Sequence, residues 1–239
     1  MLRFLLTAPL VAANTLAFGI AASLAGLLQR SGTLARRLVG AWSRSLLFLW
    51  GVKVQVHGLA DLPDGAAVYA ANHQSALDIP ILFGHLPVDF RIVHKRSLYL
   101  IPLVGWYLWA GGHISIDRSR AFRARRSMAK ASERIRRGTS LVVFPEGTRS
   151  HDETVQAFKR GSFVLALQAG APVVPLSLAG VKRVAPRGLT RLRRGTVTLV
   201  VHPAVATVDR SVDDAAQLAD EVRQVVVRGC VAALLPHPA

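Results

Sequence analysis

The stretch best suited to proton transfer is "NHQSALD", residues 72–78, in which His73 precedes Asp78 by five positions. Within one regular helix, this spacing would set the two side chains about 140° apart, because each residue turns the helix by about 100°. A helix that begins near Ser75 instead leaves His73 in a loop and puts Asp78 in the first turn. Asp78 can then hold one imidazole nitrogen and leave the other free as a base.

Two other interpretations of these residues stay open. Ser75 and Asp78 match a Ser-x-x-Asp capping box, in which case His73 is an ordinary loop residue. Ser75, His73 and Asp78 are also the residue types of a nucleophilic serine site. The Gly-x-Ser-x-Gly turn that exposes such a serine is missing, however, and Ser75 suits a helix cap better.

A second polar segment, "FPEGTRS" at residues 144–150, follows an apolar strand expected at 140–144. Open α/β sheets bind ligands at the carboxyl ends of their strands, which is where this turn would lie. Gly147 permits a tight turn with exposed N–H groups, and Arg149 offers a bidentate fork for a phosphate. The segment therefore predicts an anion site, with an ordinary polar turn as the alternative.

The remaining histidines and the one cysteine suggest no further chemistry. Cys230 cannot form an internal disulfide, so we expect a buried structural thiol and a catalytic domain that faces a reducing cytosol. No HExxH or Cys/His ligand spacing occurs, so no metal site is expected. The histidines without such spacing are His57, His85, His94, His113, His151, His202 and His237.

The composition combines positive charge with an apolar character. The 239 residues carry a formal net charge of +16, yet 51% are apolar and the mean hydropathy is +0.34. A basic chain can bind nucleic acid, anionic lipid or an acidic partner. The high hydropathy favours a membrane surface, and no helix-turn-helix, RNA-recognition or zinc-finger pattern supports nucleic acid.

The N-terminal region is long and apolar enough to anchor the chain in a membrane. The 26 residues between Arg3 and Arg30 carry no charge, and as a helix they would reach about 39 Å, more than the ~30 Å of a hydrocarbon core. Residues 38–52 read as an interfacial helix whose Trp42 and Trp50 favour the headgroup boundary. A membrane span, a hairpin in one leaflet and a cleaved signal peptide are the alternatives, and an anchor or hairpin fits best.

Alternating strands and helices are expected after residue 51. Short apolar runs bounded by Gly, Pro or Asn predict strands, and longer amphipathic runs predict helices. This alternation indicates a mixed, largely parallel β-sheet flanked by helices, with residues 1–50 as a membrane-anchoring segment and 51–239 as the α/β domain. Strands are expected near residues 52–58, 66–72, 90–95, 112–117, 140–147, 172–180 and 196–202, and helices near 75–86, 120–137, 157–169 and 213–235.

Four segments in order give the chain a resemblance to a known family. "NHQSALD", "GHISIDR" (112–118), "FPEGTRS" and "VPLSLAG" (174–180) resemble the ordered motifs of the glycerolipid acyltransferases, over roughly residues 50–205. One such motif is weak, whereas four in order are specific. One departure is Ser115, where the family often carries an aromatic or bulky apolar residue.

The resemblance implies roles for individual residues. It implies that His73 is the general base, that Asp78 orients it, and that an acceptor hydroxyl attacks an acyl thioester without a covalent acyl-enzyme. It implies that Arg149 holds the acceptor's phosphate. Further residues implied to bind or shape the phosphate site are Glu146, Gly147, Thr148, Arg118 and Lys95, and Val174 and Pro175 are implied to lie along the acyl-binding side.

The resemblance also implies partners and a location. The expected reaction moves an acyl group from acyl-CoA or an acyl carrier protein to 1-acyl-glycerol-3-phosphate, with no cofactor, at the cytoplasmic side of a membrane. Half of the 30 Lys and Arg residues lie in the windows 118–137 and 182–194, which suit lipid headgroups, an acidic carrier protein or the phosphates of CoA, or are simply solvated. Another lysolipid or lyso-aminolipid acceptor, and a non-catalytic basic protein, are the alternatives.

Overall fold

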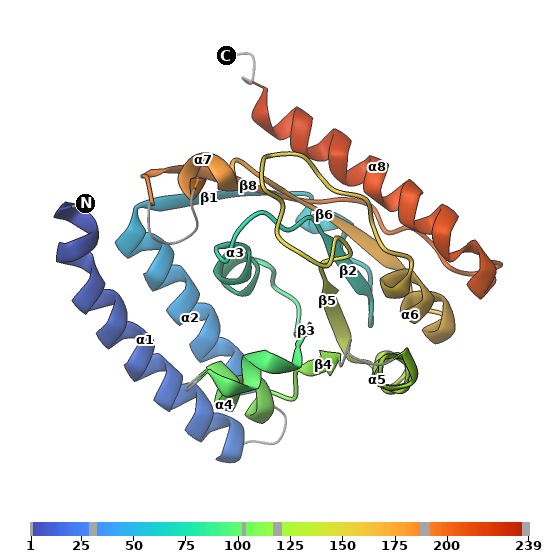
Figure 1. Ribbon diagram of the computed structural model, residues 1–239, viewed down its shortest axis with the longest axis horizontal. Helices are drawn as coiled ribbons and strands as arrows, with labels where there is room; N and C mark the ends of the chain where they lie inside the picture. The colour runs from blue at the N-terminus through green and yellow to red at the C-terminus, as the bar shows by residue number, and fades with distance from the viewer. Residues whose placement is uncertain (1, 29–32, 102–103, 117–120, 187–191, 236–239) are drawn as a thin grey trace.

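A central β-sheet lies between two layers of helices in the computed structural model (Figure 1). The structure describes residues 2–28, 33–101, 104–116, 121–186 and 192–235, without the side chains of 2–6 and 121–125. A mixed, mostly parallel sheet with flanking helices confirms the predicted fold class.

The sheet runs in the order β1-β8-β6-β2-β5-β3-β4, and β8 is antiparallel to β6 while the other pairs described are parallel. The central strands β2, β5 and β6 are buried at every residue. Strands covered on both faces need continuous apolar runs, which explains "VYAA" and "SLVV". The strands are β1 (Val52–His57), β2 (Val68–Ala71), β3 (Phe90–Lys95), β4 (Ile114–Ile116), β5 (Ser140–Val143), β6 (Val173–Ala179) and β8 (Gly195–Val201).

The helices divide between the two faces of the sheet and bury two separate apolar clusters. Helices α2 and α3 pack into one cluster, and α5, α6 and α8 pack into the other. The helices are α1 (Leu2–Leu28), α2 (Thr33–Trp50), α3 (Asp78–His85), α4 (Val104–Ala110), α5 (Ala121–Arg136), α6 (Gly161–Ala169), α7 (Val181–Val184) and α8 (Ala215–Leu234), with short 3₁₀ helices η1 (Leu59–Asp61), η2 (Arg96–Leu100) and η3 (Val212–Asp214).

The predicted helix near residues 120–137 is confirmed by α5. Ala131 and Ile135 are buried on α5. The helix ends at Arg136, and the turn that follows contains Gly138, whose φ of 91° is one that a residue with a Cβ rarely adopts.

The two N-terminal helices form a hairpin that packs onto the rest of the chain. Thr7–Leu28 is long and apolar enough to cross a membrane, as the uncharged sequence predicts. Helix α2, by contrast, buries one face against α3. The prediction that Trp42 and Trp50 lie at the headgroup boundary is wrong: Trp50 is part of the core, and the Trp42 indole N–H donates to the Thr15 hydroxyl at 3.2 Å. An amphipathic helix can bury its tryptophans in the protein as readily as in lipid.

Candidate active site

The two polar segments singled out in the sequence meet at one edge of the sheet. His73 follows the end of β2, and the 144–150 turn follows the end of β5, the strand paired with β2. Because β2 and β5 are parallel, their carboxyl ends lie side by side. The register of the sheet therefore brings together residues that are more than seventy positions apart.

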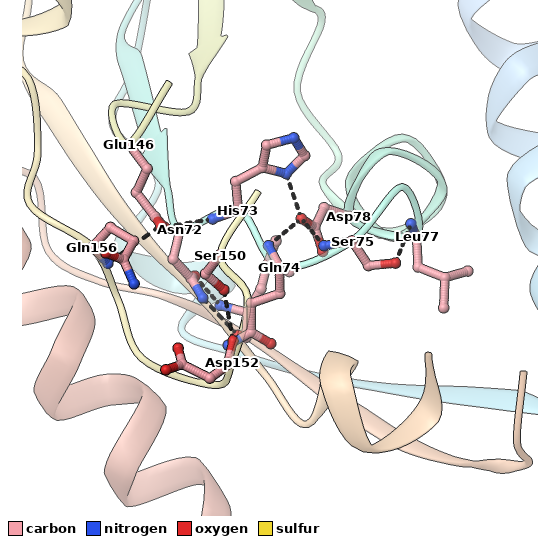
Figure 2. Close-up of polar contacts among 11 residues, drawn as sticks. Asn72, His73, Gln74, Ser75, Leu77, Asp78, Glu146, Ser150, Asp152 and Gln156 are labelled. Carbon is pink, nitrogen blue, oxygen red and sulfur yellow. Dashed lines mark hydrogen bonds and ion pairs between the residues drawn. The ribbon is translucent and has the colours of Figure 1, made fainter. Parts of the chain in front are cut away.

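His73 and Asp78 form a hydrogen-bonded pair, as the loop interpretation predicts. The imidazole Nδ1 lies 2.6 Å from Oδ2 of Asp78, a residue with no solvent exposure (Figure 2). Helix α3 begins at Asp78, so His73 stays in the loop before it. Since the carboxylate accepts the Nδ1 proton, the lone pair of the imidazole is at Nε2, which makes no hydrogen bond to any described residue.

The Asp78 carboxylate also organises the loop. Oδ2 accepts hydrogen bonds from the backbone N–H groups of Gln74 at 2.7 Å and Ser75 at 3.0 Å. The bond to Ser75 is the acidic half of the capping box. The other half is missing, because the Ser75 hydroxyl accepts from the N–H of Leu77 instead. Both predicted roles of Asp78 are thus present, and the serine has no bond to His73 that would activate it as a nucleophile.

The backbone of His73 is held from the other segment. Its N–H donates to Glu146 Oε1 at 2.7 Å, and its carbonyl accepts from the N–H of Ser150 at 2.8 Å (Figure 2). Glu146 Oε2 accepts from the N–H of Gln156 at 3.2 Å. Burial raises the pKa of Glu146, while the two backbone N–H groups act in the opposite direction. The imidazole ring of His73 stacks on the ring of Phe144, with centroids 4.2 Å apart.

Sequence reasoning missed a buried amide next to the histidine. Asn72 donates its Nδ2 to the Leu178 carbonyl at 2.9 Å, and its Oδ1 accepts from the Leu178 N–H at 2.8 Å. The side chain thereby continues the β2–β6 ladder just beyond the end of β2. The sequence did contain one indication: Asn72 directly follows the apolar residues of β2. A polar side chain buried at such a position needs hydrogen-bond partners.

The described residues among those predicted to bind phosphate lie around this edge. Thr148 and Arg149 are exposed, and Gly147 has a φ of 79° that forms the turn. Arg149 directly precedes Ser150, whose N–H donates to the His73 carbonyl. Within the described part of the chain, Arg149 forms no ion pair. Lys95 is exposed at the end of β3, the other neighbour of β5. Arg118 lies outside the described residues.

An apolar cavity of about 480 Å³ opens between the N-terminal hairpin and the sheet. Ala76 from the catalytic loop and Ile79 and Pro80 from α3 reach its wall, so it lies beside the loop and the helix that carry Asp78. The other lining residues are Val11, Thr15, Phe18, Gly19, Ala22, Val39, Trp42, Leu46, Trp50, Phe83, Ile92, His94, Leu98, Val104, Tyr107 and Leu108.

Val174 and Pro175, predicted to lie along the acyl-binding side, do not line this cavity. Both are buried in β6, where Val174 belongs to the core and Pro175 pairs with Ala70 of β2. Their acyl-binding role stays a prediction, which the position of the cavity does not support. Sequence could not locate the cavity because helices α1, α2, α3 and α4 and strand β3 form it together.

Within the described residues, no three His, Cys, Asp or Glu side chains gather in a way that could hold a metal ion. Cys230 is buried on α8, and this burial raises its pKa to about 12. A thiol with that pKa is not a nucleophile near neutral pH, in agreement with the predicted structural role.

Known proteins match the chain across this region. A family model described as acyltransferase matches residues 53–179. A 1-acyl-sn-glycerol-3-phosphate acyltransferase of Chlamydomonas reinhardtii is 42% identical over 181 residues, 73% of this chain and 52% of the algal protein. The enzyme of that name from Limnanthes alba is 31% identical over 208 residues, 87% of this chain and 73% of the plant protein. The chain spans about half the length of the Chlamydomonas, Arabidopsis and Brassica relatives.

A solved structure matches over the whole chain. The crystal structure of the 1-acyl-sn-glycerophosphate acyltransferase PlsC from Thermotoga maritima has a TM-score of 0.82 and 28% sequence identity, covering 100% of this chain and 96% of PlsC. The family model takes in more than half of the chain, including both segments that meet at the sheet edge. The chain belongs to the acyltransferase family.

Proposed function

We propose that this protein transfers a fatty acyl group from an acyl thioester to the free hydroxyl of 1-acyl-glycerol-3-phosphate, giving phosphatidic acid. The observation that carries the proposal is the His73–Asp78 pair, with Nδ1 bound to a buried carboxylate and Nε2 without a partner among the described residues. The names of the matching relatives supply the substrate class. Membership of the acyltransferase family also argues against the alternative of a non-catalytic basic protein.

His73 acts as the general base in the proposed reaction. Nε2 takes the proton of the acceptor hydroxyl while the oxygen attacks the thioester carbonyl. The tetrahedral intermediate collapses with cleavage of the C–S bond, and the imidazolium returns the proton to the departing thiolate. Asp78 stabilises the imidazolium formed in between, and no covalent acyl-enzyme is needed because a thioester is already activated.

The 144–150 turn links phosphate binding to the position of the base. Thr148 and Arg149 are exposed, and Gly147 partly exposed, where an acceptor phosphate would bind, and Arg149 can grip it with two parallel hydrogen bonds. Glu146 and Ser150 of the same turn hold the backbone of His73. Lys95 and Arg118 are proposed to add positive charge at this edge.

The apolar cavity is proposed to hold an acyl chain during transfer. Its size of about 480 Å³ is within the ~300–1,000 Å³ of typical ligand pockets, and its wall next to the catalytic loop is apolar. Helix α1 would anchor the chain in the membrane with the catalytic domain on the cytoplasmic side. The donor would be acyl-CoA or an acyl carrier protein, without a cofactor.

The proposal is tested with protein purified in detergent, lysophosphatidate and a labelled acyl donor, with the lipid product identified. His73→Ala should lower kcat by about 10³-fold or more, since a positioned base contributes roughly 10²–10⁴-fold and its buried partner is also left unpaired. His57→Ala, which removes an exposed imidazole from β1, should keep wild-type activity. Full activity of His73→Ala would refute the mechanism. Other lysolipids are tested in the same assay. Activity on one of them without activity on lysophosphatidate would show that the same chemistry acts on another acceptor.

Arg149→Ala tests the phosphate site. Loss of a charge-assisted hydrogen bond should raise the acceptor KM by about 10–100-fold with a smaller change in kcat. Arg228→Ala removes an exposed cation from α8 and serves as the matched control. An unchanged acceptor KM in Arg149→Ala would contradict the assigned role.

A further inference from the structure

The segment that begins at Ser97, after β3 and Arg96, is both uncharged and exposed. Residues 97–116 contain no Asp, Glu, Lys or Arg. Leu100 is 84% exposed, Trp106 61% and Trp109 69%, and Ile101 and Val104 are also exposed. Single exposed apolar side chains are ordinary, but five within ten residues form a patch of the kind that marks an interaction surface.

Helix α4 separates the apolar cavity from the outside of the molecule. Tyr107 and Leu108 line the cavity, while Trp106 and Trp109, three positions apart on the helix, face outward. Gly105 lies so close to η2 that a Cβ there would overlap the Tyr99 carbonyl. Residues 97–100 of η2 and helix α4, together called the η2–α4 segment, thus form a thin wall that is apolar on both sides.

The exposed patch adjoins the helix that is long enough to span a membrane. Helix α4 packs against α1, where a Cβ on Gly26 would lie 3.0 Å from the Cβ of Ala110. Near this contact α1 exposes Leu24, Leu27 and Leu28. Figure 1 shows α1, α2 and α4 on the same side of the molecule, away from α8.

Backbone N–H groups at the ends of η2 and α4 are paired within the protein, as an apolar solvent requires. Hydrocarbon offers no hydrogen bonds, so polar backbone groups must pair within the protein. The N–H groups of Ile101, Gly105, Gly111 and Gly112 donate to carbonyls three or four positions earlier, at 2.7–3.2 Å. The turn after α4 closes with a 2.9 Å bond from the His113 N–H to the Leu108 carbonyl.

We infer that the η2–α4 segment enters the lipid bilayer beside α1, with Trp106 and Trp109 at the headgroup boundary, and that α4 is the wall between lipid and the cavity. Tryptophan favours that boundary because one end of the indole is apolar and the other can donate a hydrogen bond. The absence of charge and the continuity with α1 indicate lipid as the occupant. Only the content of the cavity rests on the proposed function; the contact with lipid does not.

Fluorescence quenching by lipids with brominated acyl chains tests the inference. Two proteins are prepared in which Trp106 or Trp109 is the sole tryptophan and the others are replaced by Phe, with folding checked by circular dichroism. In vesicles of these lipids, each should lose most of its emission. The control lacks all four native tryptophans and carries Val231→Trp, at a position 57% exposed on α8. Its emission should not change.

Each result decides the inference. Unquenched Trp106 and Trp109 would overturn it, as would indoles shielded in a dimer that gel filtration detects in detergent. If the Phe background does not fold, Trp106→Phe with Trp109→Phe in the native chain replaces it, and the loss of most of the lipid-dependent quenching is expected. Acyl transfer in detergent micelles is measured in parallel. Activity without quenching refutes the inference but not the proposed function. Quenching without activity on any lysolipid refutes the proposed function but not the inference.

Discussion

At the scale of single residues, the carboxylate of Asp78 has two functions that substitution can separate. One oxygen accepts the imidazole N–H and two backbone N–H groups of the loop. The first bond fixes the tautomer and charge of the base, and the other two fix the loop. An asparagine can keep an oxygen toward the N–H groups but carries no charge to stabilise an imidazolium.

We therefore expect Asp78→Asn to lower kcat by about 10³–10⁴-fold with little change in the acceptor KM. The new buried NH₂ group finds no acceptor, and the free energy of unfolding should fall by about 1–3 kcal/mol. Steady-state kinetics and urea unfolding in detergent measure both effects. Asp89→Asn, which alters an exposed carboxylate paired with Arg91, should leave both close to wild type. A kcat within a few fold of wild type for Asp78→Asn would refute the electrostatic role.

At the scale of elements, helix α8 lies on β6 and β8 with almost no space between them. The Ser177 hydroxyl lies 2.8 Å from His202 Nε2 and donates to the Val226 carbonyl at 2.9 Å, so that β6, β8 and α8 meet at one point. A Cβ on Gly229 would overlap both the His202 ring and the Ser177 hydroxyl. The glycine is thus required for the close approach of the helix.

Gly229→Ala should lower the free energy of unfolding by about 1–3 kcal/mol, because overpacking forces the helix away from the sheet. The gain in helix propensity of up to ~1 kcal/mol opposes this loss and is smaller. Urea unfolding compares this variant with Gln224→Ala, a change at an exposed position of α8 that should be nearly neutral. A Gly229→Ala protein as stable as wild type would show that α8 can move away from Ser177 and His202 without loss of stability.

Element types were largely predictable from the sequence, whereas their arrangement was not. Short runs between turn residues located every described strand: the central strands are apolar throughout because they are buried on both faces, whereas β1 alternates apolar and polar residues. The Asn72–Leu178 contact joins residues 106 positions apart, and no local sequence pattern predicts it. The His73–Asp78 pair was predictable because five residues of loop limit where the ring can go. The cavity and the outward tryptophans of α4 depend on helix packing, and composition cannot distinguish burial in protein from burial in lipid.

At the scale of the whole molecule, partly and fully buried histidines are expected to make stability depend on pH. Burial lowers the pKa of His85, His94, His113 and His202, that of His113 to about 3. The N–H of Ile92 donates to His113 Nδ1 at 2.9 Å, a bond that exists only while that nitrogen is unprotonated. A lowered folded-state pKa means that the unfolded chain binds the proton more readily, so stability is present above pH ~6.5 and is lost on acidification.

The free energy of unfolding should therefore fall as the pH drops from 7 toward 5, by up to about 1.4 kcal/mol per pH unit for each such histidine. His113→Asn offers a neutral acceptor in place of Nδ1 and should reduce this slope, even if the smaller side chain lowers stability at every pH. Urea unfolding in detergent at several pH values measures the slope. An identical slope in the variant would exclude His113 as a contributor.

The reversed direction of β8 decides where positive charge gathers. Because β8 runs against β6, the chain enters β8 at the rim of the sheet from which His73 projects. Arg193 and Arg194, exposed just before β8, are thereby carried to that rim, on the side opposite Lys95. With a parallel β8 they would have been placed at the far rim. An anionic molecule that approaches the imidazole consequently meets cations from either flank, through a single inversion of strand polarity.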